Sequence, residues 1–169
     1  MIALRPLHPD DSFEEITDLL HRAYAPLAAQ GMAYLATHQG ADVTRDRCAR
    51  GETWLAVEGE RIVGTITLEP PPAQVHPTAG GDFYDQPGIA HFGQFAVDPA
   101  LKGEGLGGRL MDRIESRAAA LGACELALDT SVHAHGLIAM YERRGYRLVD
   151  TIDWRPAVNY PSVVLSKAL

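Results

Sequence analysis

A glycine-rich segment between an apolar stretch and an amphipathic stretch is the part of this chain best suited to bind an anion. Residues 103–108 read Gly-Glu-Gly-Leu-Gly-Gly, and a helix is predicted to begin within them at Leu106. Glycine accepts a positive φ and lets another molecule approach the main chain closely. The first turn of a helix offers unpaired N–H groups and the positive end of the helix dipole. We therefore expect an anion site here, most naturally one for phosphate.

The same segment matches the dinucleotide-binding pattern G-x-G-x-x-G, and Asp129 ends the next predicted strand, where such a protein would bind a ribose. Its surroundings argue against that interpretation. Residues 98–102 separate the preceding strand from the first glycine, whereas in a dinucleotide site the glycine follows the strand almost directly. The preceding half of the chain also reads as a β-hairpin and not as alternating strands and helices. A P-loop fits less well, because no Gly-Lys-Ser/Thr ending is present.

A second pattern, Lys-x-x-Gly-x-Gly at residues 102–107, follows a strand that ends Val-Asp-Pro at residues 97–99. Farther along, residues 141–146 read Tyr-Glu-Arg-Arg-Gly-Tyr. Together these segments resemble the GNAT acetyltransferase superfamily. Its motif A is a strand, an Arg/Gln-x-x-Gly-x-Gly/Ala turn and a long helix, and its motif B is a short helix with a tyrosine followed by Gly-Phe or Gly-Tyr. The order of the predicted elements fits that fold across nearly the whole chain.

The resemblance implies an N-acetyltransferase that uses acetyl-CoA as its co-substrate and no metal. The pyrophosphate would bind the loop N–H groups, and the pantetheine arm would run along the preceding strand as an added strand does. Two positions depart from the usual family pattern: Lys102 stands where arginine or glutamine is commoner, and Ala134 where many members have asparagine. The residues that the resemblance assigns to acetyl-CoA are Phe95, Ala96, Val97, Lys102, Gly103, Glu104, Gly105, Leu106, Gly107 and Gly108.

Acetyl transfer from a thioester to an amine needs three groups: a donor for the carbonyl oxygen, a proton donor for the leaving thiolate and a base for the acceptor. The resemblance assigns the thiolate's proton to Tyr141. A phenol suits this role because it stays protonated at neutral pH, with a reference pKa of about 10. A main-chain N–H near Phe95 or Ala96 would stabilise the charge on the carbonyl oxygen.

The base is predicted to be His91, which opens the central strand. Strand alternation would place His91 on one face with residues 93, 95 and 97. Imidazole there would accept the amine's proton directly or through water. Glu69, at the end of the predicted hairpin, and Asp85, in the long loop that follows it, are alternatives.

Other reactive side chains do not form a pattern that indicates a site. His133 and His135 alternate near Asp129, but no third ligand is suitably spaced, so no metal is expected. Neither cysteine lies in a motif for a covalent intermediate, so we expect direct acetyl transfer to a primary amine of unknown identity, on a small molecule or a peptide. The alternative function is a non-catalytic CoA-binding sensor or scaffold.

Hydrophobic periodicity predicts the elements that position these groups. The fold class is α/β: a mixed, mostly antiparallel central sheet with one parallel strand pair, flanked by helices, in a single domain over residues 1–169. The resemblance further implies that this parallel pair is splayed. Strands are predicted at residues 2–7, 53–57, 62–68, 91–97, 124–129, 146–149 and 158–165, and helices at 12–27, 28–38, 42–50, 106–121 and 136–144.

Several local expectations follow from individual residues. Asp11 is expected to cap the first helix, and Pro26 to end it or to open a second. Pro161 marks the last strand as an edge or bulged strand, and at an edge it would offer a homodimer contact. Residues 70–89 form a long Pro- and Gly-rich loop that either contacts substrate or is solvated.

Composition limits the class of partner. The chain has 169 residues, of which 15 are Lys or Arg and 22 are Asp or Glu, so its net charge is −7. A nucleic-acid partner is not expected, because no basic stripe is present. No apolar run is long enough to cross a membrane. The isolated thiols of Cys48 and Cys124 favour a reducing compartment, so we expect a cytoplasmic protein.

Overall fold

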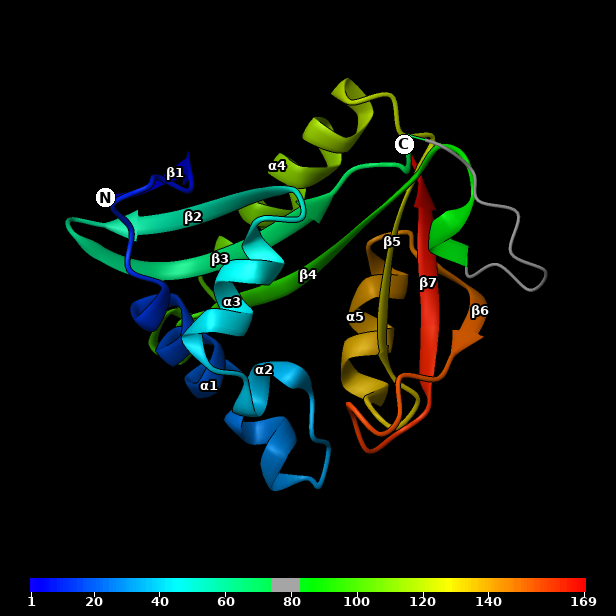
Figure 1. Cartoon of the computed structure of the whole chain (residues 1–169), viewed down its shortest axis with the longest axis horizontal. Helices are drawn as coiled ribbons and strands as arrows, with labels where there is room; N and C mark the ends of the chain where they lie inside the picture. Colours follow the sequence, from blue (N-terminus) through cyan, green and yellow to red (C-terminus); the bar gives the residue numbers. More distant parts are fainter. Residues whose placement is uncertain (74–82) are drawn as a thin grey trace. The chain divides into compact units, whose positions relative to one another are not determined.

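The computed structural model describes residues 1–73 and 83–169 (Figure 1). The predicted loop at residues 70–89 therefore lies partly outside the described residues. The helices are α1 (Phe13–Ala29), α2 (Leu35–His38), α3 (Ala41–Cys48), α4 (Leu106–Ala120) and α5 (His135–Arg143). The strands are β1 (Ile2–Pro6), β2 (Glu52–Glu58), β3 (Arg61–Glu69), β4 (Ile89–Val97), β5 (Glu125–Ser131), β6 (Arg147–Ile152) and β7 (Ser162–Ala168).

The strands form one mixed sheet in the order β1-β2-β3-β4-β5-β7-β6. The parallel pair is β4 and β5, as expected for a strand–helix–strand crossover through α4. Every other pairing whose register the structure describes is antiparallel. The predicted fold class, a mostly antiparallel sheet with one parallel pair and flanking helices, is confirmed.

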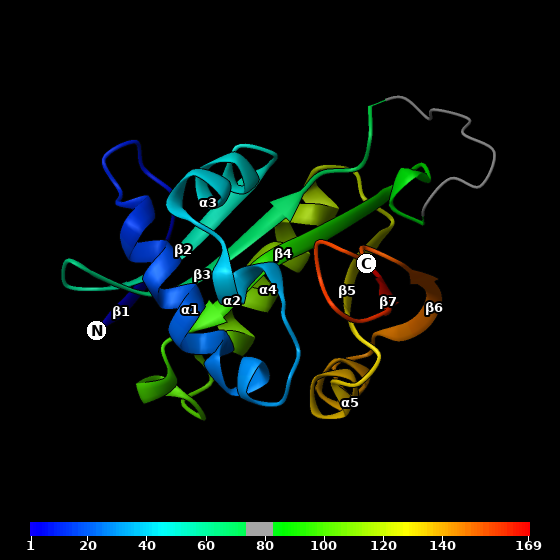
Figure 2. The ribbon, with the colours of Figure 1, turned by 60° about the horizontal axis from the view of Figure 1, so that its bottom comes forward.

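The chain divides into two compact units, and both β4 and α4 contribute residues to each. The first unit comprises Met1–Glu69 and Gly93–Ile114. Its core packs Ile16, Leu19 and Leu20 of α1 against β2, β3 and Ala96 of β4. Helices α1 and α3 lie on one face of the strands and α4 on the other (Figure 2).

The second unit comprises Pro70–Phe92 and Glu115–Leu169. Strand β5 pairs with β7 over residues 125–131, and β7 pairs with β6. The parallel ladder between β4 and β5 has three residue pairs, from Ile89–Glu125 to His91–Ala127. Ile89 of β4, Ala127 of β5 and Val164 of β7 form a small apolar cluster on this part of the sheet.

Three local predictions about the helices were wrong. The side chain that caps α1 is Ser12, whose Oγ accepts from the Glu15 N–H at 3.1 Å, because Asp11 is engaged by Arg5. Pro26 lies inside α1, which continues to Ala29. Residues 28–38 do not form one helix, because Gly31 has a φ of +87° and ends the helical path, so that only Leu35–His38 is helical.

The last strand is also placed differently from the prediction. Pro161 immediately precedes β7, where its missing N–H breaks no ladder bond, and β7 lies between β5 and β6. The edges of the sheet are β1 and β6. The predicted homodimer contact through an exposed C-terminal strand therefore loses its basis.

Candidate active site

The loop before α4 leads directly into the first turn of the helix. The carbonyl of Gly105 accepts the first bond of α4, from the Arg109 N–H at 3.1 Å. Within the described chain, the N–H groups of residues 105–108 donate to no main-chain carbonyl. These are the groups that a helix start leaves unpaired, and an anion can satisfy several of them together.

The glycines of this loop differ in backbone conformation and in the space around them. Gly103 and Gly105 have φ values of +91° and +79°, which L-residues with a side chain rarely adopt. A Cβ on Gly107 would lie 3.4 Å from Cζ of Phe95, so this glycine allows close packing of α4 on β4. A Cβ on Gly108 would meet no atom within 4 Å. Among the described residues nothing requires glycine at position 108, and the space that its Cβ would enter is empty.

Asp98 fixes the turn that joins β4 to this loop. Its Oδ1 accepts from the Ala100 N–H at 3.0 Å, and its carboxylate pairs with Arg61 of β3 and Arg22 of α1. The Ala100 bond, followed by the two arginines, holds the pKa of this buried carboxyl below its usual value despite its desolvation. The Asp-Pro sequence therefore stops the strand and also anchors the loop to two distant elements.

The side chains of β4 stop alternating between the two faces of the sheet at Gln94, which has a φ of +49°. Gly93 faces Arg47 of α3, and the Gln94 side chain bonds Gln39, while Phe95 packs against Gly107 of α4. Residues 93 and 95 therefore lie on opposite faces, and the predicted common face of residues 91, 93, 95 and 97 does not form. The physical reason is the positive φ, which breaks strand alternation in the manner of a β-bulge.

Tyr141 lies on α5 in a cluster of aromatic rings. It is buried, with its ring centroid 6.1 Å from that of Phe92 on β4 and 5.8 Å from that of Tyr146. The Tyr146 hydroxyl donates to Glu115 at 3.1 Å, and burial, reinforced by this carboxylate, raises the pKa of Tyr146. Tyr146 thus remains a neutral phenol that fixes the helix carrying Tyr141.

Glu115 is the shared acceptor of an ionic cluster at the end of α5. Arg144 donates to it at 2.8 Å and Lys167 at 2.9 Å. Burial alone would raise the pKa of Glu115, but the bonds from these two cations outweigh burial and lower it. The charged carboxylate therefore links α4, α5 and β7 within the second unit.

His91 stacks on Tyr84, with ring centroids 4.2 Å apart and planes inclined by 19°. The Tyr84 hydroxyl donates to Asp129 Oδ1 at 2.7 Å, and Trp154 Nε1 donates to Asp129 Oδ2 at 3.0 Å. From the sequence, Asp129 was a candidate only for a ribose or metal ligand. Its link through Tyr84 to His91 depends on a side chain 45 positions away, and no local pattern indicates such a link.

The alternative bases and the remaining loop residues are positioned differently. Asp85 is exposed in a short 3-10 turn, Phe83–Asp85, and Glu69 is half-buried at the end of β3. Lys102 and Glu104 are exposed beside the glycines. Ala134 is buried at the start of α5 and makes no side-chain cap.

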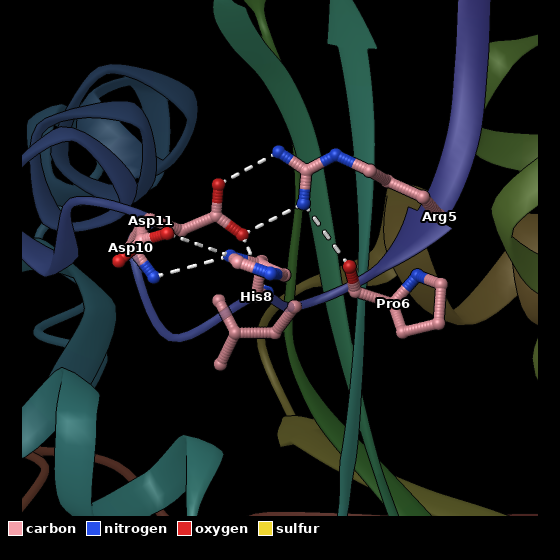
Figure 3. Close-up of a pocket in the computed structure, with 6 residues that line it drawn as sticks. Arg5, Pro6, His8, Asp10 and Asp11 are labelled. Carbon is pink, nitrogen blue, oxygen red and sulfur yellow. Dashed lines mark hydrogen bonds and ion pairs between the residues drawn. The ribbon is translucent and has the colours of Figure 1, made fainter.

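A separate pocket lies beside the N-terminal segment (Figure 3). Its lining residues are Arg5, Pro6, Leu7, His8, Asp10 and Asp11. Arg5 donates to both oxygens of Asp11 at 2.7 Å, and its hydrogen bond is the main cause that lowers the pKa of Asp11. These bonds tie β1 to the start of α1, so the polar groups have a structural role.

Residues 1–73 and 83–169 contain no group of three or more His, Cys, Asp or Glu side chains arranged to hold a metal ion. None of the helices described is long and apolar enough to cross a membrane.

Comparison with known proteins identifies relatives of the chain. A sequence model of the acetyltransferase (GNAT) family matches residues 13–146. The S-(2-succino)cysteine N-acetyltransferase of Bacillus subtilis (strain 168) is 30% identical over 138 residues, which cover 79% of this chain and 77% of that enzyme.

Solved structures show the same fold at lower identity. The protein PH1933 from Pyrococcus horikoshii OT3 has a TM-score of 0.76 at 17% identity, covering 100% of this chain and 99% of its own. A GNAT family acetyltransferase from Elizabethkingia anophelis, solved with acetyl-CoA bound, has a TM-score of 0.68 at 17% identity, covering 99% and 98% of the two chains.

Proposed function

The chain belongs to the acetyltransferase (GNAT) family and is an acetyl-CoA-dependent N-acetyltransferase, and we propose that the residues described above bind acetyl-CoA and act in direct transfer to a primary amine. The observation that carries this assignment is the loop at residues 105–108, with its N–H groups at the start of α4 and open space beside Gly108. A pyrophosphate bears negative charge and several acceptor oxygens, and it matches these donors.

We assign the donor's contacts as follows. The pyrophosphate binds the loop of residues 103–108, whose N–H groups at residues 105–108 donate to no main-chain carbonyl of the described chain, and Lys102 adds a positive charge at the loop. The pantetheine arm runs along the main chain of Phe95, Ala96 and Val97. In support, β4 extends to Val97, directly before the turn that leads into the loop.

Acetyl-CoA supplies an activated thioester, and the chain supplies the groups that move protons and stabilise charge. Tyr141 donates a proton or a hydrogen bond to the departing sulfur. A main-chain N–H near Phe95 or Ala96 donates to the carbonyl oxygen as its negative charge grows. His91 accepts the proton of the attacking amine, because an amine whose pKa lies above 7 is mostly protonated at neutral pH and only its free form attacks.

We propose that the acceptor is the amine of an S-substituted cysteine or a similar amino acid. The relative from Bacillus subtilis supports this class, because its name gives S-(2-succino)cysteine as its acceptor. The net charge of −7 does not oppose an acceptor with an ammonium group, although repulsion would slow the approach of one with several carboxylates.

We also propose a cytoplasmic location. Cys124 is an exposed free thiol and Cys48 a buried one, and both fit a reducing compartment.

The test is an acetyl-CoA turnover screen against a panel of amines, with S-(2-succino)cysteine as the first acceptor. We expect release of the CoA thiol to depend on the amine, together with an N-acetylated product. Tight binding of CoA in calorimetry without turnover of any amine would contradict the proposed acceptor class and transfer mechanism.

A further inference from the structure

Strand register places Asp129 of β5 on the same face of the sheet as His91 of β4. His91 pairs with Ala127 in the parallel ladder, and Asp129 follows Ala127 by two residues. Paired residues on neighbouring strands share a face, and so do residues two apart within a strand. The side chains of His91 and Asp129 therefore project from one face of the sheet, within the second unit.

Tyr84, from the short 3-10 turn Phe83–Asp85, lies on this face and connects the two side chains. It packs against the small apolar cluster formed by β4, β5 and β7. Its hydroxyl donates to Asp129 Oδ1 at 2.7 Å, and its ring stacks on the His91 imidazole with the centroids 4.2 Å apart. Apolar packing, a hydrogen bond and a ring stack therefore all bear on this one side chain.

The Asp129 carboxylate is held by both of its oxygens. Trp154 Nε1 donates to Oδ2 at 3.0 Å, while the Tyr84 hydroxyl donates to Oδ1. A hydrogen bond to a carboxylate is stronger than one between two neutral groups. Asp129 is therefore a firm anchor for the phenol, and through the phenol it acts on the ring stacked beneath it.

The orientation of a histidine ring depends on its neighbours, because the torsion χ2 that turns the ring has only broad preferences of its own. A nearly parallel aromatic ring restricts that torsion, and the planes of Tyr84 and His91 are inclined by 19°. His91, Tyr84 and Asp129 are all half-buried, so His91 is supported by Tyr84 and keeps part of its surface exposed.

From these contacts we infer that Tyr84, anchored by Asp129, is a positioning residue that holds the His91 imidazole ready to accept the acceptor's proton. The inference rests on the proposed function, in which His91 is the base. In that step the ammonium form of the acceptor gives one proton to an imidazole nitrogen, which leaves a free amine and an imidazolium. The imidazolium then lies on the face of an aromatic ring, where a cation is favoured. A base oriented by a third group is a general feature of such sites.

The test is a double-mutant cycle between positions 84 and 91, measured as kcat/KM at pH 7. The acceptor is the amine of the panel that the wild-type enzyme acetylates fastest, which we expect to be S-(2-succino)cysteine. Tyr84→Leu removes the stacked ring and should lower kcat/KM about 10- to 100-fold, the loss that a misplaced catalytic group causes. In a His91→Gln background the same change should cost less than about 3-fold, because no base is left to position. The Kd for CoA should stay the same in both backgrounds.

Two further variants separate positioning from packing. Tyr84→Phe keeps the ring on His91 and removes only the bond to Asp129, so it should lower kcat/KM less than Tyr84→Leu, by about 3- to 10-fold. Phe83→Leu is the matched control, because Phe83 packs against the same apolar cluster from the same turn. It should lower Tm and leave kcat/KM within about 3-fold of the wild type. Circular dichroism and thermal unfolding show whether each variant is folded, and Tyr84→Phe takes the place of Tyr84→Leu in the cycle if the latter does not fold.

The contrary results distinguish the inference from the proposed function. An equal fall in kcat/KM in both backgrounds, or a fully active Tyr84→Leu variant, would overturn the inference and leave His91 as the base. A fully active His91→Gln variant would refute the base and the inference together, with acetyl transfer itself intact. If no amine is acetylated while CoA still binds, the proposed function fails and the inference fails with it.

Discussion

Replacing Gly108 with alanine should stabilise the protein and weaken acetyl-CoA binding, and these opposite effects make it an informative perturbation. Position 108 lies in the first turn of α4 and has no positive φ, and a Cβ there meets no atom within 4 Å. Alanine is favoured over glycine in a helix by up to about 1 kcal/mol. For a chain of this size, that corresponds to an increase in Tm of about 2–4 °C.

The effect on binding has the opposite sign because the Cβ would enter the empty space at Gly108, where we place the pyrophosphate. Loss of one hydrogen bond to a charged group costs about 1.5–3 kcal/mol. The Kd for acetyl-CoA should therefore rise about 10- to 100-fold. Calorimetry with CoA and thermal unfolding of the same preparation measure the two quantities.

Ser116→Ala is the control for helix propensity, because Ser116 is exposed on the same helix, beyond the loop. It should raise Tm slightly and leave the Kd unchanged. A Gly108→Ala variant that is more stable but binds CoA as tightly as the wild type would refute the placement of the pyrophosphate at this N–H.

Three further predictions concern the remaining groups. Tyr141→Phe should lower kcat by about 100-fold and leave the Kd for CoA unchanged. Tyr146→Phe should lower Tm and leave kcat unchanged. A fully active Tyr141→Phe variant would refute the assignment of Tyr141 as the proton donor. His91→Gln should lower kcat/KM near pH 7, and the deficit should shrink as the pH rises past the pKa of the acceptor's amine, where the amine is free without a base. A deficit that stays constant with pH would argue against His91 as the base. The pKa of Asp98 is lowered, so its ionised form stabilises the fold above about pH 4, and this contribution is lost as the pH falls through the folded-state pKa. Asp98→Asn should therefore lower the free energy of unfolding by about 2 kcal/mol at pH 7 and by progressively less under acid conditions. An equal loss at pH 7 and pH 3, measured by urea unfolding, would contradict this.

The features that local sequence determines were predicted well. A glycine loop before an amphipathic helix requires only neighbouring residues, and the strand–helix–strand spacing indicated the parallel pair of β4 and β5. Asp98 was correctly expected to end β4, because proline follows it. Its partners Arg22 and Arg61 come from elements far away in the sequence, and no local pattern indicated them.

The errors came from long-range structure. Glutamine rarely adopts a positive φ, and Gln94 does so while its side chain bonds Gln39, Cys48 and Thr67 from three other segments. This network, and with it the reversal of face along β4, depends on tertiary contacts that alternation cannot predict. The position of β7 inside the sheet likewise follows from its pairing with both β5 and β6.

The central claim is that the chain transfers acetyl groups from acetyl-CoA to the amine of an α-amino acid. The most direct measurement is mass spectrometry of the products after incubation with acetyl-CoA and S-(2-succino)cysteine, with CoA thiol release followed in parallel. We predict a product heavier by one acetyl group on its amine and one CoA thiol released for each product formed. CoA release at the same rate with and without the amine, and no acetylated product from any amine in the panel, would contradict it.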